Sequence, residues 1–358
     1  MWHPKFKTKN LNMNEIMKRV NPAILSQERR AVLGVATIMI LLVHSVPYLP
    51  TDNKILLLLS KCCGYGSLGV PIFAFLSGIG IYYSLSNNKL NDYYWNRINR
   101  TFIPFVIMAI IVCSIFYLFL EWKPLTFIEE ITTLSFWLNH HGPWYIAMLV
   151  PLYLISPVYY HWNLSGGVKC VIVSILATTI AVVVNIVDSS LYHHICNVYC
   201  SSVIYFVGMY IGEMIYKKKH VCALYVYLPI LLHIIQIVFF RIFHNTIMDV
   251  LHSPIRDLTY VLLASSITWI LSYFFSMFND GIWKKLWNKF GNISLESYLF
   301  NTYFGYAIHY MLSRNVLPKD DVLYGVYVIT CVIGLLMSTP YQKLIKKHFY
   351  VKPIQKTH

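Results

Sequence analysis

The sequence predicts an all-α membrane protein, a polytopic bundle of about ten transmembrane helices, from three observations. The first is composition: the 358 residues are 57% hydrophobic and only 12% charged, whereas soluble domains are about 25% charged. The second is that apolar residues form runs of about 20, the length of a helix that crosses ~30 Å of hydrocarbon. The third is the distribution of Lys and Arg between these runs, which gives the bundle one consistent orientation.

The apolar runs are candidate transmembrane helices. In chain order they cover residues 31–49, 66–86, 101–120, 143–161, 167–187, 198–216, 221–240, 257–278, 292–312 and 322–341. With the N-terminus in the cytoplasm, the inside segments hold 22 of the 29 Lys and Arg residues. Because basic residues favour the cytoplasmic side, both termini are predicted to be cytoplasmic. Topology therefore explains the net charge of +14, and we expect no nucleic-acid partner.

The chain divides into a basic cytoplasmic segment (1–30), one transmembrane domain (31–341) and a basic cytoplasmic tail (342–358). The first 28 residues are polar and basic and lack the short apolar core of a signal peptide, so the first apolar run is expected to span the membrane. Loops are short, and no Pro/Gly/Ser-rich linker interrupts the chain. We therefore expect a single multi-pass domain surrounded by membrane lipid.

Several function classes lack their usual motifs. The sequence has no GxxxxGK[ST] phosphate loop, no GxGxxG after a strand and no GxSxG elbow, which argues against ATP-driven transport and serine-hydrolase chemistry. No zinc or iron–sulfur spacing is present, so we expect no metal. Cys196 and Cys200 lie four residues apart near the outer side. They are interpreted as small apolar fillers, with a disulfide as the alternative in an oxidising compartment.

His44 lies near the outer end of the first apolar run, AVLGVATIMILLVHSV, which contains no formally charged residue. An ionisable side chain in hydrocarbon is costly unless it faces the bundle interior or a wet cavity, so it is a candidate functional residue. The alternatives are a neutral imidazole bonded to a neighbouring helix, or a residue at the membrane interface beside Pro47.

The predicted outer loops are polar and rich in aromatic residues. They contain Glu121, Glu129, Glu130 and the pairs His140–His141 and His193–His194, with Asp52, Asp188, Asp249, Asp320 and Asp321. Such segments can line an entry for a hydroxylated substrate. The alternative is a solvated surface with Trp and Tyr anchors at the membrane interface.

Four stretches carry a family resemblance. They are RRAVLGVATIMILLVHS, GYGSLGVPIFAFLSGIGIYYSLS, YYWNRINRTFIPF and GNISLESYLFNTYF, with a weaker middle element, PWYIAMLVPLYLISPVYY. In this order they resemble segments of the acyltransferase 3 family, bacterial integral-membrane O-acyltransferases that modify surface glycans. The resemblance implies transfer of an acyl group, usually acetyl from acetyl-CoA, to a hydroxyl of a polysaccharide or lipid-linked glycan. It also implies a location in the bacterial inner (cytoplasmic) membrane.

The family's catalytic histidine falls on His44, where a neutral imidazole can take a hydroxyl proton or form an acyl adduct. The family usually has a basic residue eleven positions earlier, but here that position is Leu33. Arg30 is 14 residues before His44, about 40° off the same helix face and about 21 Å below it. Its side chain is expected to lean away from His44, toward phosphate of the acyl donor. The alternative is an ordinary cytoplasmic flank.

Other family positions also match. Arg97 and Arg100 correspond to a basic pair before Pro104, and we expect them to bind coenzyme A phosphates, with topology anchoring as the alternative.

Ser77, beside Gly78, is a further candidate for donor binding, with a small-residue helix contact as the alternative. Glu296 matches the family's glutamate, and we expect it either to orient His44 or to hold Arg100. Asn301 stands where the family often has a histidine, so no second catalytic histidine is predicted.

A rival function from another class is a membrane carrier or flippase for a glycan or small solute, which also requires buried polar groups. Coenzyme A binding discriminates the two, since a carrier has no need for it. A glycan polymerase ranks last, because the outer segments are short and hold only seven basic residues.

Overall fold

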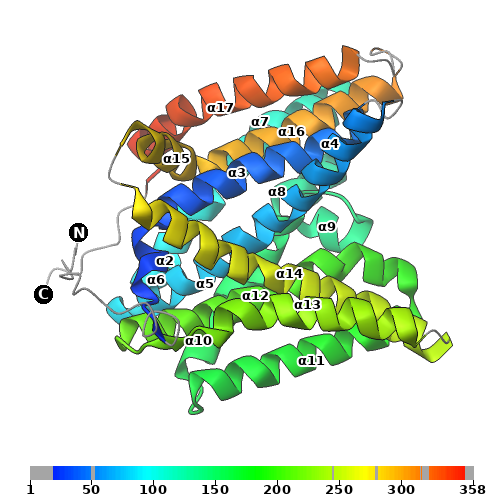
Figure 1. Cartoon of the computed structure of the whole chain (residues 1–358). Helices are drawn as coiled ribbons and strands as arrows, with labels where there is room; N and C mark the ends of the chain where they lie inside the picture. The colour runs from blue at the N-terminus through cyan, green and yellow to red at the C-terminus, as the bar shows by residue number, and fades with distance from the viewer. Residues whose placement is uncertain are drawn as a thin grey trace, which may run out of the picture.

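The computed structural model describes residues 19–49, 53–243, 246–278, 281–314, 316 and 322–350. The described chain is almost entirely helical, which confirms the all-α class (Figure 1). Its helices are α2 (Ala23–Gln27), α3 (Arg29–Ser45), α4 (Lys54–Gly64), α5 (Gly69–Asn87), α6 (Leu90–Arg97), α7 (Ile103–Cys113), α8 (Pro124–Ile131), α9 (Leu134–Asn139), α10 (Trp144–His161), α11 (Gly166–Val187), α12 (Ser189–Tyr216), α13 (Leu224–Ile242), α14 (Thr246–Met277), α15 (Ile282–Asn292), α16 (Ser294–Ser313) and α17 (Val322–His348).

Shorter elements connect these helices. They are the 3₁₀ helices η1 (Val46–Tyr48) and η2 (Tyr65–Leu68), the π-helical segments η3 (Ile98–Phe102) and η4 (Ser114–Leu120), and the strands β1 (Arg19–Val20) and β2 (Val221–Cys222). The two strands pair antiparallel. This pairing ties the segment before α2 to the loop before α13, and the predicted topology puts both on the cytoplasmic side. Residues 1–18 and 351–358 of the predicted cytoplasmic segments, and Asp52, Asp320 and Asp321, lie outside the described residues.

By length and composition, eight helical segments of the described chain can cross a membrane. They are 29–48, 54–87, 90–120, 166–187, 189–216, 224–242, 251–277 and 323–348. The other two predicted spans also form helices, α10 and α16, of 18 and 20 residues. They are less apolar than the eight, because α16 contains Glu296, Asn301 and His309, and α10 contains four tyrosines, a serine and His161.

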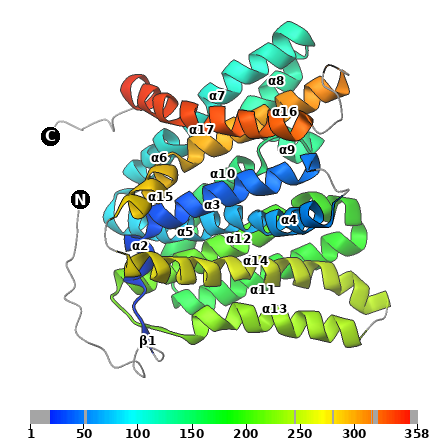
Figure 2. The same cartoon turned by 45° about the horizontal axis from the view of Figure 1, so that its top comes forward.

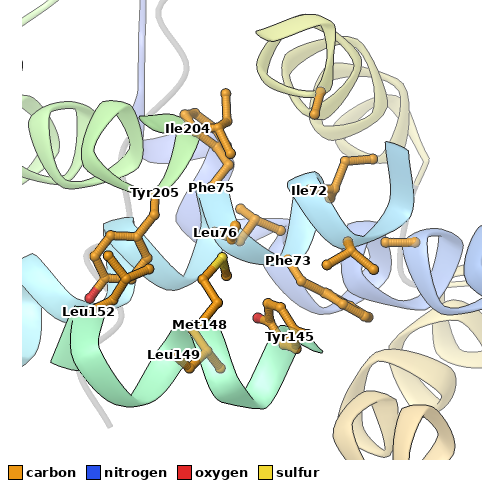
Figure 3. Packing of buried hydrophobic residues seen from close by; sticks show 14 of the residues in the cluster. Ile72, Phe73, Phe75, Leu76, Tyr145, Met148, Leu149, Leu152, Ile204 and Tyr205 are labelled. Atoms are coloured by element: carbon orange, nitrogen blue, oxygen red, sulfur yellow. The ribbon is translucent and has the colours of Figure 1, made fainter. Parts of the chain in front are cut away.

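Helix α5 lies at the centre of the bundle and is buried on nearly every side. It packs against α3, α10 and α12, and Figure 3 shows α5 side chains such as Leu76 meeting Met148 of α10 and Tyr205 of α12. The α5–α12 contact needs a glycine: a Cβ at Gly78 would lie 2.0 Å from the Tyr205 carbonyl oxygen. Small residues let membrane helices approach closely in this way.

Helix α3 lies between α5 and α15 and also contacts α16 and α17. Figure 2 shows α16 and α17 on one side of it and α14 on the other. A Cβ at Gly34 would lie 2.2 Å from the Trp287 carbonyl oxygen, so this glycine permits the close α3–α15 packing. The two ends of α3 carry two predicted site residues, His44 at one end and Arg30 at the other, where Arg29 begins the helix.

Candidate functional site

His44 is held by a residue of α16. Its Nδ1 hydrogen-bonds to the side-chain oxygen of Asn301. Asn301 in turn donates from Nδ2 to the hydroxyl of Tyr327 on α17 at 2.9 Å. The Tyr327 hydroxyl donates to the Leu41 carbonyl of α3 at 2.7 Å. Three helices thus meet in a closed hydrogen-bond network at the end of α3.

This network determines the tautomer of His44. The Leu41 carbonyl can only accept, so the single proton of Tyr327 points toward it, and the Tyr327 oxygen must accept from Asn301. The Asn301 amide is thereby oriented with its oxygen toward His44, and an amide oxygen also can only accept. Nδ1 of the neutral imidazole therefore carries the proton, and Nε2 carries a lone pair. His44 is prepared to accept a proton at Nε2.

The His44 side chain is exposed, whereas Asn301 and Tyr327 are buried. Tyr48 of η1 stacks on Tyr327 with ring centroids 5.1 Å apart and covers the network from the end of α3. The orienting groups are thus packed inside the protein, while His44 itself lies at the protein surface. This is the arrangement expected of a general base or nucleophile whose geometry is fixed by its neighbours.

Arg29, Arg97 and Arg100 gather at the opposite end of the bundle, where α3 begins and α6 leads through η3 into α7. They lie near enough for the charges of Arg97 and Arg100 to act on Arg29. Arg97 donates to the Ser84 hydroxyl at 3.4 Å. Its guanidinium also lies 5.8 Å from the ring centroid of Tyr153.

Two guanidinium nitrogens in this cluster, Nε of Arg29 and Nε of Arg97, are buried without a hydrogen-bond partner among the described residues. Adjacent cations repel, and buried donors without partners are unfavourable. An anion bound between the arginines would relieve both. Arginine forks bind phosphate with two parallel hydrogen bonds, so the cluster has the chemistry of a phosphate-binding site.

The structure brings Arg29, rather than the predicted Arg30, into this cluster. The Arg29 guanidinium lies against Gly80 of α5, where an added Cβ would be 3.0 Å from Nη1. Arg30 is exposed, and its backbone carbonyl faces Gly291 of α15. Adjacent residues on a helix point about 100° apart. The helical spacing from His44 points to Arg30, but the space that receives an arginine side chain is made by α5 and is occupied by Arg29.

Buried tyrosines continue from the arginine cluster into the bundle. The Tyr145 hydroxyl neighbours the Ser77 hydroxyl and is near Arg29 and Tyr153. The Tyr145 ring contacts Tyr298 of α16 in an edge-on arrangement with centroids 5.6 Å apart. Ser77 thus lies in the bundle, beyond the arginines, and its hydroxyl is engaged with Tyr145.

Glu296 does not contact either predicted partner. It is 6% exposed and accepts a hydrogen bond from Gln342 of α17 at 3.0 Å. On α16 it lies five residues before Asn301, and this spacing turns its side chain about 140° away from the side that faces His44. The role expected of Glu296, orienting His44, belongs to Asn301. Glu296 instead links α16 to α17.

The predicted outer loops contribute a third group. Glu130 of α8 is buried and bonds to His141, which lies just before α10. This hydrogen bond from the carboxylate raises the pKa of His141 above its ordinary value, against the opposing effect of burial. Both residues line a cavity of about 340 Å³ next to α16.

Comparison with known proteins agrees with the sequence resemblance. The acyltransferase 3 family model, described as an acyltransferase domain, matches residues 33–340. No curated protein and no solved structure matches the chain. The matched region begins within α3 and ends within α17, so it includes His44, Arg97, Arg100 and Asn301, while Arg29 lies just before it. The chain therefore belongs to the acyltransferase 3 family and is a multi-pass membrane acyltransferase.

Proposed function

We propose that this protein transfers an acyl group, acetyl in the first instance, from acyl-CoA to a hydroxyl of a cell-surface or exported polysaccharide. The bacterial inner membrane is the proposed location. The observation that carries the proposal is the fixed tautomer of His44, whose Nε2 lone pair is oriented by Asn301 and Tyr327. A carrier needs a polar site but does not need a base prepared in this way.

The donor is proposed to dock with its phosphates on Arg29, Arg97 and Arg100. Buried guanidinium nitrogens without partners support this assignment. Arg29 lies 15 residues before His44, which corresponds to about 22 Å along α3. The donor's thioester arm would have to cover this distance inside the bundle, along the tyrosines that follow the arginines.

The chemistry follows from the protonation state of His44. Nε2 takes the proton of the acceptor hydroxyl as that oxygen attacks the thioester carbonyl, so a C–O bond forms and the C–S bond breaks. The coenzyme A thiolate then takes the proton from the imidazolium, which restores the neutral ring. Positioned proton transfer of this kind contributes about 10²–10⁴-fold to a rate.

The first test is acetyl-CoA binding by the purified protein in detergent. We expect micromolar binding, lost in the Arg29→Gln/Arg97→Gln double variant and retained in Arg30→Gln, a matched control on the same helix. The second test is glycan acetylation, which His44→Gln should lower by about 10²–10⁴-fold. A well-folded protein that does not bind acetyl-CoA, or a fully active His44→Gln variant, would overturn the proposal and favour the carrier.

A further inference from the structure

A cavity of about 340 Å³ opens between η4, α8, α9 and the second half of α16. Its volume lies at the lower end of the range for small-molecule sites. It lies at the His44 end of the bundle. Helices α3 and α7 both start near the arginine cluster; α3 ends at His44 and Ser45, and α7 leads into η4. The predicted topology makes this the outer side.

Three polar atoms in the cavity wall are buried without a hydrogen-bond partner in the described part of the chain. They are Oε2 of Glu130, Oγ of Ser135 and the hydroxyl of Tyr303. Their residues are 1%, 1% and 2% exposed, respectively. Buried polar groups in proteins are nearly always paired. One unpartnered carboxylate oxygen and two unpartnered hydroxyls converging on one cavity therefore fit a ligand that both donates and accepts hydrogen bonds.

The backbone before α10 is shaped to build this wall. Thr133, His140 and Gly142 all have positive φ, 65°, 57° and 110°, a conformation uncommon for residues other than glycine. A Cβ at Gly142 would lie 2.6 Å from Oγ of Ser135 and 3.4 Å from Oε2 of Glu130. The left-handed conformation and the close approach both require glycine here, and together they bring the loop onto the unpartnered oxygens.

Aromatic rings supply the rest of the surface. Tyr306 of α16 stacks on His141 with centroids 4.8 Å apart, and Tyr310 meets Phe116 of η4 edge-on at 5.1 Å. Ring faces offer an apolar surface beside the hydrogen-bonding groups. A sugar ring matches this combination, because its C–H face is apolar and its rim carries hydroxyls that donate and accept.

The charges around the cavity are already paired. Glu121 bonds to Lys123 at 2.7 Å and lies 3.6 Å from Arg314. Glu130 bonds to His141. An anionic ligand such as a phosphate would meet the Glu130 carboxylate and have no unpaired arginine to bind. The cavity thus differs in chemistry from the arginine cluster at the opposite end and favours a neutral ligand.

The cavity is also distinct from the His44 site. Asn301, which holds His44, and Tyr306, which lines the cavity, are five residues apart on α16 and so point about 140° apart. Tyr303 is two residues from Asn301 and also points to the far side. The helix α16 therefore separates two sites at the same end of the bundle, and an extended glycan could contact both with different sugar units.

We propose that this cavity binds a neutral sugar unit of the acceptor glycan, next to the unit whose hydroxyl meets His44. The proposal rests on the proposed function for the identity of the glycan as acceptor. Glu130, Ser135 and Tyr303 bond to the sugar hydroxyls, and Tyr306 lies against the ring.

The test uses the full chain in detergent and neutral tetrasaccharides built of glucose, galactose or N-acetylglucosamine, with binding followed by saturation-transfer NMR. We expect Tyr303→Phe and Ser135→Ala each to raise the Kd of the bound tetrasaccharide about fivefold, as loss of one hydrogen bond predicts. Acetyl-CoA affinity should not change. Tyr324→Phe of α17 and Ser202→Ala of α12 are matched controls away from the cavity and should leave both affinities unchanged.

Wild-type tetrasaccharide affinity in both cavity variants would overturn the proposal, as would acetyl-CoA binding without any tetrasaccharide binding. If the wild-type protein does not bind acetyl-CoA, the proposed function is overturned instead. In that case, a tetrasaccharide Kd that rises in Tyr303→Phe and Ser135→Ala would still support a sugar site. Failure of the proposed function and failure of the sugar site therefore give different results.

Discussion

The tautomer of His44 depends on a residue that does not touch it. Tyr327→Phe removes the hydroxyl that accepts from Nδ2 of Asn301. In the native network, turning the Asn301 amide over would lose one net hydrogen bond, because the Tyr327 proton would have to leave the Leu41 carbonyl. One such bond contributes about 0.5–1.5 kcal/mol, equivalent to a two- to twelvefold preference. Without it, the amide can present Nδ2 to His44, and Nε2 then carries the proton.

We therefore expect Tyr327→Phe to lower kcat by at most about twelvefold, with the KM for acyl-CoA unchanged, because the base-competent fraction cannot fall by more than that preference. The assay pairs steady-state acyl transfer with ¹⁵N NMR of the His44 ring, which distinguishes the Nδ1–H and Nε2–H forms. Tyr324→Phe, one turn earlier on α17, is the matched control. Wild-type kcat together with a wild-type ¹⁵N spectrum would refute the reasoning, and a loss above about 100-fold would show that Tyr327 acts in another way.

Two further predictions concern stability. Gly78→Ala should destabilise the protein by about 1–3 kcal/mol or more, because its Cβ would lie 2.0 Å from the Tyr205 carbonyl oxygen. Gly64→Ala is the control, because a Cβ at Gly64 would have no atom within 4 Å. This variant should be as stable as the wild type, or more stable, in the same thermal melts. The raised pKa of His141 predicts stabilisation that is complete below about pH 6.5 and is lost as the pH rises through the folded-state pKa. The difference in Tm between wild type and His141→Gln should therefore shrink as the pH rises above about 6.5, and a constant difference would contradict this.

The helices were predictable from the sequence because each spanning helix must satisfy its own backbone and present apolar side chains to lipid. Even α10 and α16, which are less apolar than the other eight, form at the predicted places. For the loop residues Glu130 and His141 the sequence leaves two interpretations open, a substrate entry or a solvated surface, and the structure places both in the wall of a cavity. Their hydrogen bond depends on the left-handed turn at Gly142. No local sequence pattern predicts how this turn directs the His141 side chain.

Contacts between distant helices do not follow from any local pattern in the sequence. In the sequence Asn301 is only a departure from the family pattern, and its bond to His44 joins residues 257 positions apart. Glu296 matches the family's glutamate and is expected to orient His44 or to hold Arg100, yet it accepts a hydrogen bond from Gln342 of α17. Helical periodicity predicts which residues share a face, but it does not determine which neighbouring helix that face contacts.

The substitution at Leu33 can now be related to the arginine cluster. Arg29 lies four residues before Leu33, so it shares the same face of α3 one turn closer to the start of the helix. Gly80 of α5 leaves room for its guanidinium. We infer that Arg29 replaces the basic residue that the family has at the Leu33 position. We further infer that Arg29 binds the donor phosphates and does not contact His44.

This inference predicts what happens when the arginine is moved from position 29 to position 33. Arg29→Gln alone should raise the KM for acetyl-CoA about tenfold, the effect of losing roughly 1.4 kcal/mol of charge-assisted hydrogen bonding. Adding Leu33→Arg should recover part of this affinity, because the long side chain leans back toward the start of the helix and can reach the same cluster. Leu33→Gln, added instead, supplies no charge and should recover none. Equal KM values for the two double variants would show that the position of Arg29 beside Gly80, and not the charge on this face of α3, determines donor binding.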